Sequence, residues 1–82
     1  MELFEGLIDK KIMKVLGLFL SNPEGYYHIN KVSKESKVPL ATSFRIINQL
    51  AENNLIIQIK ISKFKIYKLA NNEKTKKLRR LL

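Results

Sequence analysis

Residues 37–48 bring together side chains whose chemistry suits contact with a polyanion. Arg45 carries a planar fork of N–H groups that can pair with a phosphate or with the edge of a guanine. Thr42 and Ser43 fall in the expected first turn of a helix, where hydroxyls and free backbone N–H groups can hold a phosphate. The candidate contact residues in this stretch are Lys37, Pro39, Leu40, Ala41, Thr42, Ser43, Phe44, Arg45 and Asn48.

Three apolar side chains lie among these candidates. Leu40, Ala41 and Phe44 share the expected outward face of the helix. In the major groove of DNA, an apolar side chain on such a face meets the methyl groups of thymine. The alternative is that Leu40 and Phe44 turn back into the core, as large apolar side chains at helical spacing usually do. The sequence leaves both arrangements open.

A helix-turn-helix would place this stretch at the surface. A first short helix is expected over Lys31–Ser36, with Asn30 as its N-cap. Pro39 suits the first turn of a second helix that runs to about Asn53, and Asn53-Asn54 can provide its left-handed stop. The inner side of this motif would consist of Val32, Ser33, Val38, Ile46, Ile47 and Leu50.

Residues 55–70 change to an alternation with period two, which predicts a β-hairpin with its turn at Ser62-Lys63. In that register Lys60 lies opposite Lys65, and like charges in direct opposition destabilise a hairpin. A phosphate between the two lysines would explain the pair. Two lysines that point into solvent and protect an edge are the alternative. The candidate backbone contacts are Lys60, Lys63 and Lys65, and one face of the hairpin would consist of Ile57, Ile59, Ile61, Phe64 and Ile66.

Two further helices are expected at the ends of the chain. Asp9 can cap a helix that runs to about Leu20, and Asn71 or Asn72 can cap a basic helix that continues to Leu82. This last helix is expected to pack on the N-terminal helix, within the chain or across a dimer; a backbone contact and a disordered tail are the alternatives. Apolar residues at both ends favour a homodimer. The candidate dimerisation residues are Leu3, Phe4, Leu7, Leu78, Leu81 and Leu82.

The composition limits the classes of protein to which the chain can belong. Its 82 residues suffice for one domain, 1–82, and with no cysteine and one histidine it has neither a disulfide framework nor a plausible metal site. A capping or surface role is expected of His28. Apolar runs are too short for a membrane span and no basic leader is present, so a cytoplasmic protein is expected. No nucleophile–base pair or glycine-rich phosphate loop occurs, so neither an enzyme nor a cofactor is expected.

The charge of the chain is distributed unevenly. Residues 26–82 hold thirteen of the sixteen Lys and Arg residues and three of the seven Asp and Glu residues, whereas residues 1–25 are close to neutral. A basic region beside a neutral one is typical of a protein that binds a polyanion such as double-stranded DNA. The alternative is a charged surface that keeps a small protein soluble.

The segment from Val38 to Ile56 resembles the winged-helix transcriptional regulators of the MarR and ArsR type. Their recognition helix typically has the pattern small-Thr-x-x-Arg-apolar-apolar-x-x-Leu before a Gly-Leu-Val strand. Here the matching residues are Ala41-Thr42-Ser43-Phe44-Arg45-Ile46-Ile47-Asn48-Gln49-Leu50, followed by Asn54-Leu55-Ile56. The run Lys65-Ile66-Tyr67-Lys68-Leu69 is similar to the returning wing strand of that family. The resemblance covers about residues 9–70, and frequent Lys, Ile and Asn favour an archaeal source, or an archaeal plasmid or virus.

Three departures accompany the resemblance. Lys37 stands where the turn of the family often has glycine, and Ser36 takes a place that is usually apolar. Ser43-Phe44 inverts the usual order of an apolar residue followed by a small one. The chain also has no cluster of Cys, His and acidic residues that could match the metal ligands of ArsR-type proteins.

The resemblance implies an α+β fold that is mostly helical, a winged helix-turn-helix with a three-helix core, a β-hairpin wing and a C-terminal helix. It implies a sequence-specific DNA-binding transcriptional regulator whose recognition helix, about 39–53, enters the major groove while the wing, about 55–70, lies on the backbone. Two alternatives stay open. One is a winged helix that docks a protein through Leu40, Phe44 and the apolar wing face, and the other is an architectural DNA-binding protein without sequence preference.

Overall fold

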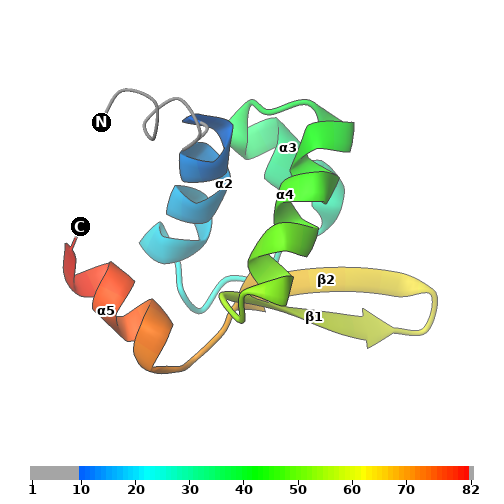
Figure 1. The fold of residues 1–82 in the computed structure, drawn as a ribbon. Coiled ribbons are helices and arrows are strands. Elements are labelled where there is room, and N and C mark those ends of the chain that lie inside the picture. Colours follow the sequence, from blue (N-terminus) through cyan, green and yellow to red (C-terminus); the bar gives the residue numbers. More distant parts are fainter. Residues whose placement is uncertain (1–9, 82) are drawn as a thin grey trace.

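The computed structural model describes residues 10–81, which form a helix-turn-helix and a hairpin between two flanking helices (Figure 1). This order confirms the predicted, mostly helical α+β fold. The expected cap at Asp9 and the candidate dimerisation residues Leu3, Phe4, Leu7 and Leu82 lie outside the described residues. The elements are α2 (Lys10–Ser21), α3 (Ile29–Ser36), α4 (Leu40–Glu52), β1 (Ile56–Ile61), β2 (Phe64–Leu69) and α5 (Glu73–Leu81).

The core lies between α2, α3 and α4 and is completed by the base of the hairpin. Its apolar residues recur at helical spacing, so each helix turns one face towards the other two. Val15 and Phe19 of α2 and Val32 of α3 have no exposed surface, and neither have Ile46 and Ile47 of α4. The apolar inner residues predicted for the helix-turn-helix, Val32, Val38, Ile46, Ile47 and Leu50, are all buried.

Tyr27 connects the helices to the hairpin. Its backbone N–H and C=O exchange hydrogen bonds of 2.8 Å with Tyr67 of β2, and the two residues form an isolated β-bridge. The Tyr27 ring meets the ring of Phe19 edge-on, with the centroids 5.0 Å apart. Tyr67 is itself buried, and this burial raises the pKa of its phenol. The hairpin base is therefore fixed to α2 through two aromatic residues.

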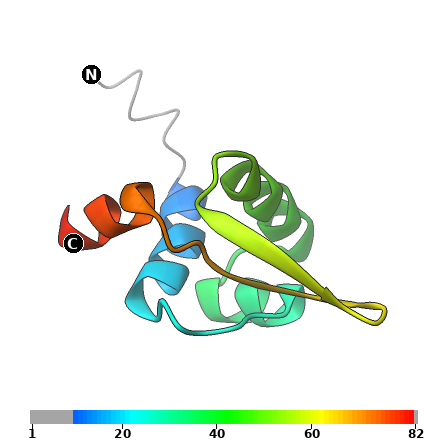
Figure 2. The same cartoon turned by 90° about the horizontal axis from the view of Figure 1, so that it is seen from below.

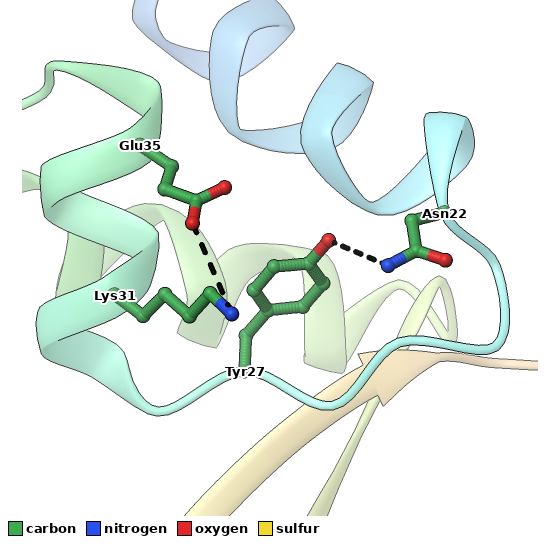
Figure 3. Close-up of polar contacts among 4 residues, drawn as sticks. All are labelled: Asn22, Tyr27, Lys31 and Glu35. Carbon is green, nitrogen blue, oxygen red and sulfur yellow. Dashed lines mark hydrogen bonds and ion pairs between the residues drawn. The ribbon is translucent and has the colours of Figure 1, made fainter.

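Polar contacts hold Tyr27 from both sides (Figure 3). Its hydroxyl accepts a hydrogen bond of 3.2 Å from the side-chain amide of Asn22, which follows α2. Lys31 Nζ of α3 lies 5.6 Å from the centre of the Tyr27 ring and 3.9 Å from Glu35 Oε2. These contacts link the end of α2 to α3 and give the Lys31 charge partners within the protein.

The hairpin adopts the predicted register, with Lys60 opposite Lys65. Ser62 takes a left-handed φ of 58° in the turn. The face that packs on the helices is buried only near the base of the hairpin, at Ile56, Tyr67 and Leu69. The remainder projects away from the helices, which Figures 1 and 2 show from two directions.

The ends of α3 and α4 follow from local hydrogen bonds. His28 Nδ1 accepts a hydrogen bond of 3.3 Å from the N–H of Asn30, so His28 is the N-cap of α3 and confirms the capping role expected of it. The prediction that Asn30 caps the helix is wrong, because α3 begins one residue earlier, at Ile29. The Ile29 side chain packs partly against the core. Asn53 is the C-cap of α4, and Asn54 after it adopts a φ of 63°, which is the predicted left-handed stop.

α5 lies against α2, on the side of the molecule away from the hairpin (Figure 2). Asn72 Oδ1 accepts a hydrogen bond of 3.0 Å from the N–H of Thr75, and the buried Thr75 hydroxyl donates to the Ala70 carbonyl at 2.7 Å. Leu78 packs against the core of its own chain, whereas Leu81 is 81% exposed. The expected packing of the terminal helix on the N-terminal helix is confirmed within the chain, and Leu78 contributes to that packing.

Candidate nucleic-acid interface

The Val38 carbonyl, in the turn between α3 and α4, is bonded to both helices. It accepts one hydrogen bond of 2.6 Å from the hydroxyl of Ser33 on α3 and another of 3.1 Å from the hydroxyl of Ser43 on α4. Each helix therefore donates to the same turn atom. The sequence assigned Ser33 to the inner side but missed this arrangement, although the spacing of five residues on either side of Val38 was a usable signal.

Ser43, whose hydroxyl the sequence had suggested as a phosphate contact, faces the core. Its side chain has no exposed surface and its hydroxyl is committed to Val38, so the expected phosphate contact of this hydroxyl is wrong. The reason is helical geometry, since Ser43 is followed at helical spacing by the buried residues Ile46, Ile47 and Leu50. The inverted order Ser43-Phe44 thus places the small residue inward and the aromatic residue outward.

The other candidate residues of α4 lie on its outer side. Leu40 is 48% exposed and Phe44 is 44% exposed, so the alternative in which these two side chains fold into the core is wrong. Arg45 and Asn48 are also exposed, and Thr42 is half-buried. Pro39, Ala41 and the neighbouring Lys37 are exposed at the start of the helix. The outer face of α4 is therefore apolar near the N-terminus of the helix and polar from Arg45 onward.

The N-terminus of α4 has no side-chain cap. Pro39 is the N-cap residue, with φ −53° and ψ 148°, and makes no capping hydrogen bond from its side chain. The Ser43 N–H donates to the Pro39 carbonyl at 2.8 Å, so the N–H groups of residues 40–42 precede the first bond of the helix. Such groups, with the positive end of the helix dipole, favour a phosphate oxygen. The sequence predicted Pro39 in the first turn of this helix, and it lies one residue before that turn, as the N-cap.

The wing adds cations without any acid. Lys60 and Lys65 are exposed and directly opposite each other, and Lys63 is exposed in the turn. No Asp or Glu occurs between Glu52 and Glu73, so the wing can only repel a cationic partner and attract an anionic one.

The other face of the wing is apolar and exposed. Residues directly opposite each other in an antiparallel pair share a face, so Ile61 and Phe64 lie on the face that does not carry Lys60 and Lys65. Ile57, Ile61 and Phe64 are 43%, 56% and 59% exposed. The helices cover the opposite face at the base, and within residues 10–81 Ile61 and Phe64 remain open to solvent.

The C-terminal end of α4 is tied to α5. Lys74 Nζ donates to the Asn53 carbonyl at 2.9 Å, and the Asn72 amide donates to the Asn54 carbonyl at 2.8 Å. A cation at the C-terminal end of a helix also complements the helix dipole. Lys74 therefore has a structural partner, whereas Lys76, Lys77, Arg79 and Arg80 are exposed on the outer side of α5.

Residues 10–81 contain no group of three or more His, Asp and Glu side chains that could hold a metal ion. None of the helices in the same range is long and apolar enough to span a membrane.

No protein-family model and no curated protein matches this chain. Solved structures with similar folds do exist. A possible transcriptional regulator from Methanosarcina mazei Go1 is 20% identical, with a TM-score of 0.70, and the match covers 89% of this chain and 65% of that one. A MarR family transcriptional regulator from Silicibacter pomeroyi DSS-3 is 17% identical, with a TM-score of 0.66, over 87% of this chain and 48% of that one.

A third similar structure is Sso10a-2, a DNA-binding protein from Sulfolobus solfataricus. It is 23% identical, with a TM-score of 0.66, and the match covers 84% of this chain and 70% of that one. At these identities the likeness defines the fold, and the fold is the winged helix-turn-helix. The chain spans less than two thirds of the first two structures, at 65% and 48% of their lengths.

Proposed function

We propose that this chain is a sequence-specific DNA-binding transcriptional regulator whose α4 enters the major groove while the wing lies along the backbone. The observation that carries the proposal is the position of Arg45. This side chain is exposed on a helix whose opposite face, Ser43, Ile46, Ile47 and Leu50, is anchored in the core. A helix held in this way can present a guanidinium to a guanine edge in a fixed orientation.

The distribution of charge and the structural relatives support this function. Lys37 lies beside the N-terminus of α4, and Lys60, Lys63 and Lys65 lie on the wing, so both elements carry cations suited to phosphates. One of the structures with the same fold is named as a possible transcriptional regulator, another as a MarR family transcriptional regulator and a third as a DNA-binding protein. Transfer of that function to this chain is part of the proposal.

A homodimer on a short palindrome completes the proposal. Two-fold symmetry would set two α4 helices about 34 Å apart, one turn of DNA, so that both could reach half-sites on one face of the duplex. Leu81 is 81% exposed at the end of α5 and is an apolar side chain available to a partner copy. Sedimentation at micromolar concentration would detect the dimer, and replacing Leu81 by Asp should shift it towards monomer. A wild-type monomer that binds DNA tightly would contradict this part.

Selection of bound duplexes from a random pool tests the main proposal. A recovered motif with dyad symmetry is the expected result, and its binding should weaken steeply with salt because phosphate contacts release counterions. Retention of random duplexes with no motif would instead identify an architectural protein without sequence preference. Failure to retain any duplex would contradict DNA binding altogether.

The exposed wing face favours a second candidate function, the docking of a protein. Ile57, Ile61 and Phe64 form an apolar surface that the helices do not cover. An interface built on such a surface would depend little on salt, in contrast to a DNA complex. Replacing Ile61 by Ser would separate the two functions, because it should weaken a protein partner and leave DNA affinity nearly unchanged.

A further inference from the structure

An open apolar hollow lies at the N-terminal end of α4. Its lining consists of Leu40, Ala41 and Phe44 from α4 and Ile29 from the first turn of α3. Because both helices contribute to the lining, the width of the hollow depends on the angle between α3 and α4. Leu40 and Phe44 are each close to half exposed, so their side chains form the rim.

Stability of the core does not account for this group of side chains. α4 already buries a complete face, formed by Ser43, Ile46, Ile47 and Leu50, and the hollow lies beside that face, not on it. Large apolar side chains that stay exposed contribute little to the free energy of folding. Exposed apolar patches usually mark a binding surface, so an occupant that covers these side chains would explain them.

The charges beside the hollow restrict its occupant. Lys37 precedes α4 and Arg45 follows Phe44, and both are exposed, while the single acid of α4, Glu52, lies at the far end of the helix. These charges favour an occupant that carries an apolar group on an anionic body. In duplex DNA, the 5-methyl group of thymine is the apolar group that the major groove displays between two lines of phosphates.

We propose that the hollow of Ile29, Leu40, Ala41 and Phe44 receives thymine methyl groups, so that α4 selects A·T base pairs beside the base contacted by Arg45. This inference rests on the proposed function, because it requires α4 to enter the major groove. It adds that part of the sequence preference comes from apolar contact and is separate from hydrogen bonding by Arg45. The first of the two helices takes part through Ile29, which the sequence had not singled out.

The test compares the duplex recovered from the random pool with the same duplex in which every thymine is replaced by uracil. Uracil pairs with adenine in the same way and lacks only the methyl group, so hydrogen-bond readout is unchanged. Burial of one methyl group corresponds to about a fourfold change in affinity. Wild-type protein should therefore bind the thymine duplex about fourfold more tightly for each methyl group that the hollow receives.

Two variants locate the effect. Phe44→Ala opens the rim of the hollow and should abolish the preference for thymine. Phe64→Ala removes the same type of side chain from an exposed position on the wing and should retain the preference. Leu40→Ala provides a second opening of the rim, and circular dichroism of all three variants confirms that the fold is intact. The thymine preference of each variant is then compared with that of the wild type.

The outcomes separate the inference from the proposed function. Equal affinity of wild-type protein for the two duplexes overturns the thymine contact and leaves DNA binding standing. A thymine preference that persists in both Phe44→Ala and Leu40→Ala also overturns it, because the methyl groups are then read elsewhere. Failure to bind either duplex overturns the proposed function itself, and the thymine contact with it.

Discussion

The two elements proposed to meet DNA, α4 and the wing formed by β1 and β2, are anchored to the molecule in different ways. α4 buries a side chain on nearly every turn, from Ser43 to Leu50, so its outer face is held along its length. The wing buries Ile56, Tyr67 and Leu69 at its base and leaves both faces exposed towards Ser62. A rigid element suits base edges, where small displacements matter, and a less anchored one suits the phosphate backbone.

Replacing Tyr67 by Ala gives the largest expected effect and tests whether the base of the wing is structural. Loss of a large, fully buried aromatic side chain should lower the free energy of unfolding by about 3–5 kcal/mol. Phe64→Ala at the tip is the matched control and should change it by less than about 0.5 kcal/mol. Urea unfolding measures both. Similar losses in the two variants would mean that the wing is anchored along its whole length.

Arg45→Ala should weaken binding to the selected duplex by about 1–3 kcal/mol, because a guanidinium contact to a base or phosphate is lost. The fold should stay intact, since the side chain is exposed. Titration with the selected and with random duplexes shows whether Arg45 reads a base, in which case only the selected duplex loses affinity. If affinity for every duplex is unchanged, α4 is not the element in the groove.

Ser43→Ala tests whether the Val38 carbonyl orients α4. Loss of this buried hydrogen bond should cost about 1 kcal/mol of stability, and the remaining bond from Ser33 limits the cost. Affinity for the selected duplex should fall although Ser43 cannot touch DNA, because the helix is less firmly oriented. Thermal unfolding and titration provide the two measurements. A stability loss without any change in affinity would show that helix orientation does not depend on this contact.

The smallest effect is expected at the paired lysines of the wing. Lys60→Ala or Lys65→Ala should lower the slope of log affinity against log salt by about one unit, equally for all duplexes, because each removes one phosphate contact. The same change relieves like-charge repulsion and should raise stability by less than about 1 kcal/mol. A variant that gains stability and keeps its salt slope would mean that both lysines point only into solvent.

The sequence predicted those features that depend on local patterns. The hairpin register followed from the turn at Ser62-Lys63, and the order of helices followed from apolar spacing. It did not predict that Ser43 is buried, because a small hydroxyl residue suits either face of a helix. It did not predict Ile29 as part of an outer hollow, because this depends on the angle between two helices. The choice between Asn30 and His28 as cap depended on which residue began α3, a boundary that packing decides.

The turns that join these elements have a consequence for thermal tolerance. Lys37 and Ser62 adopt φ values of 60° and 58°, a region that costs an ordinary residue about 1–2 kcal/mol and glycine almost nothing. The free energy of unfolding could therefore be raised by substitutions in these turns. Glycine at Ser62 would raise it without removing a charge, whereas glycine at Lys37 would raise it and remove a cation beside α4; thermal unfolding would register both. Substitution at Ser62 would thus change the melting temperature alone, and substitution at Lys37 would also change the proposed affinity for DNA. Neither substitution alters a buried side chain.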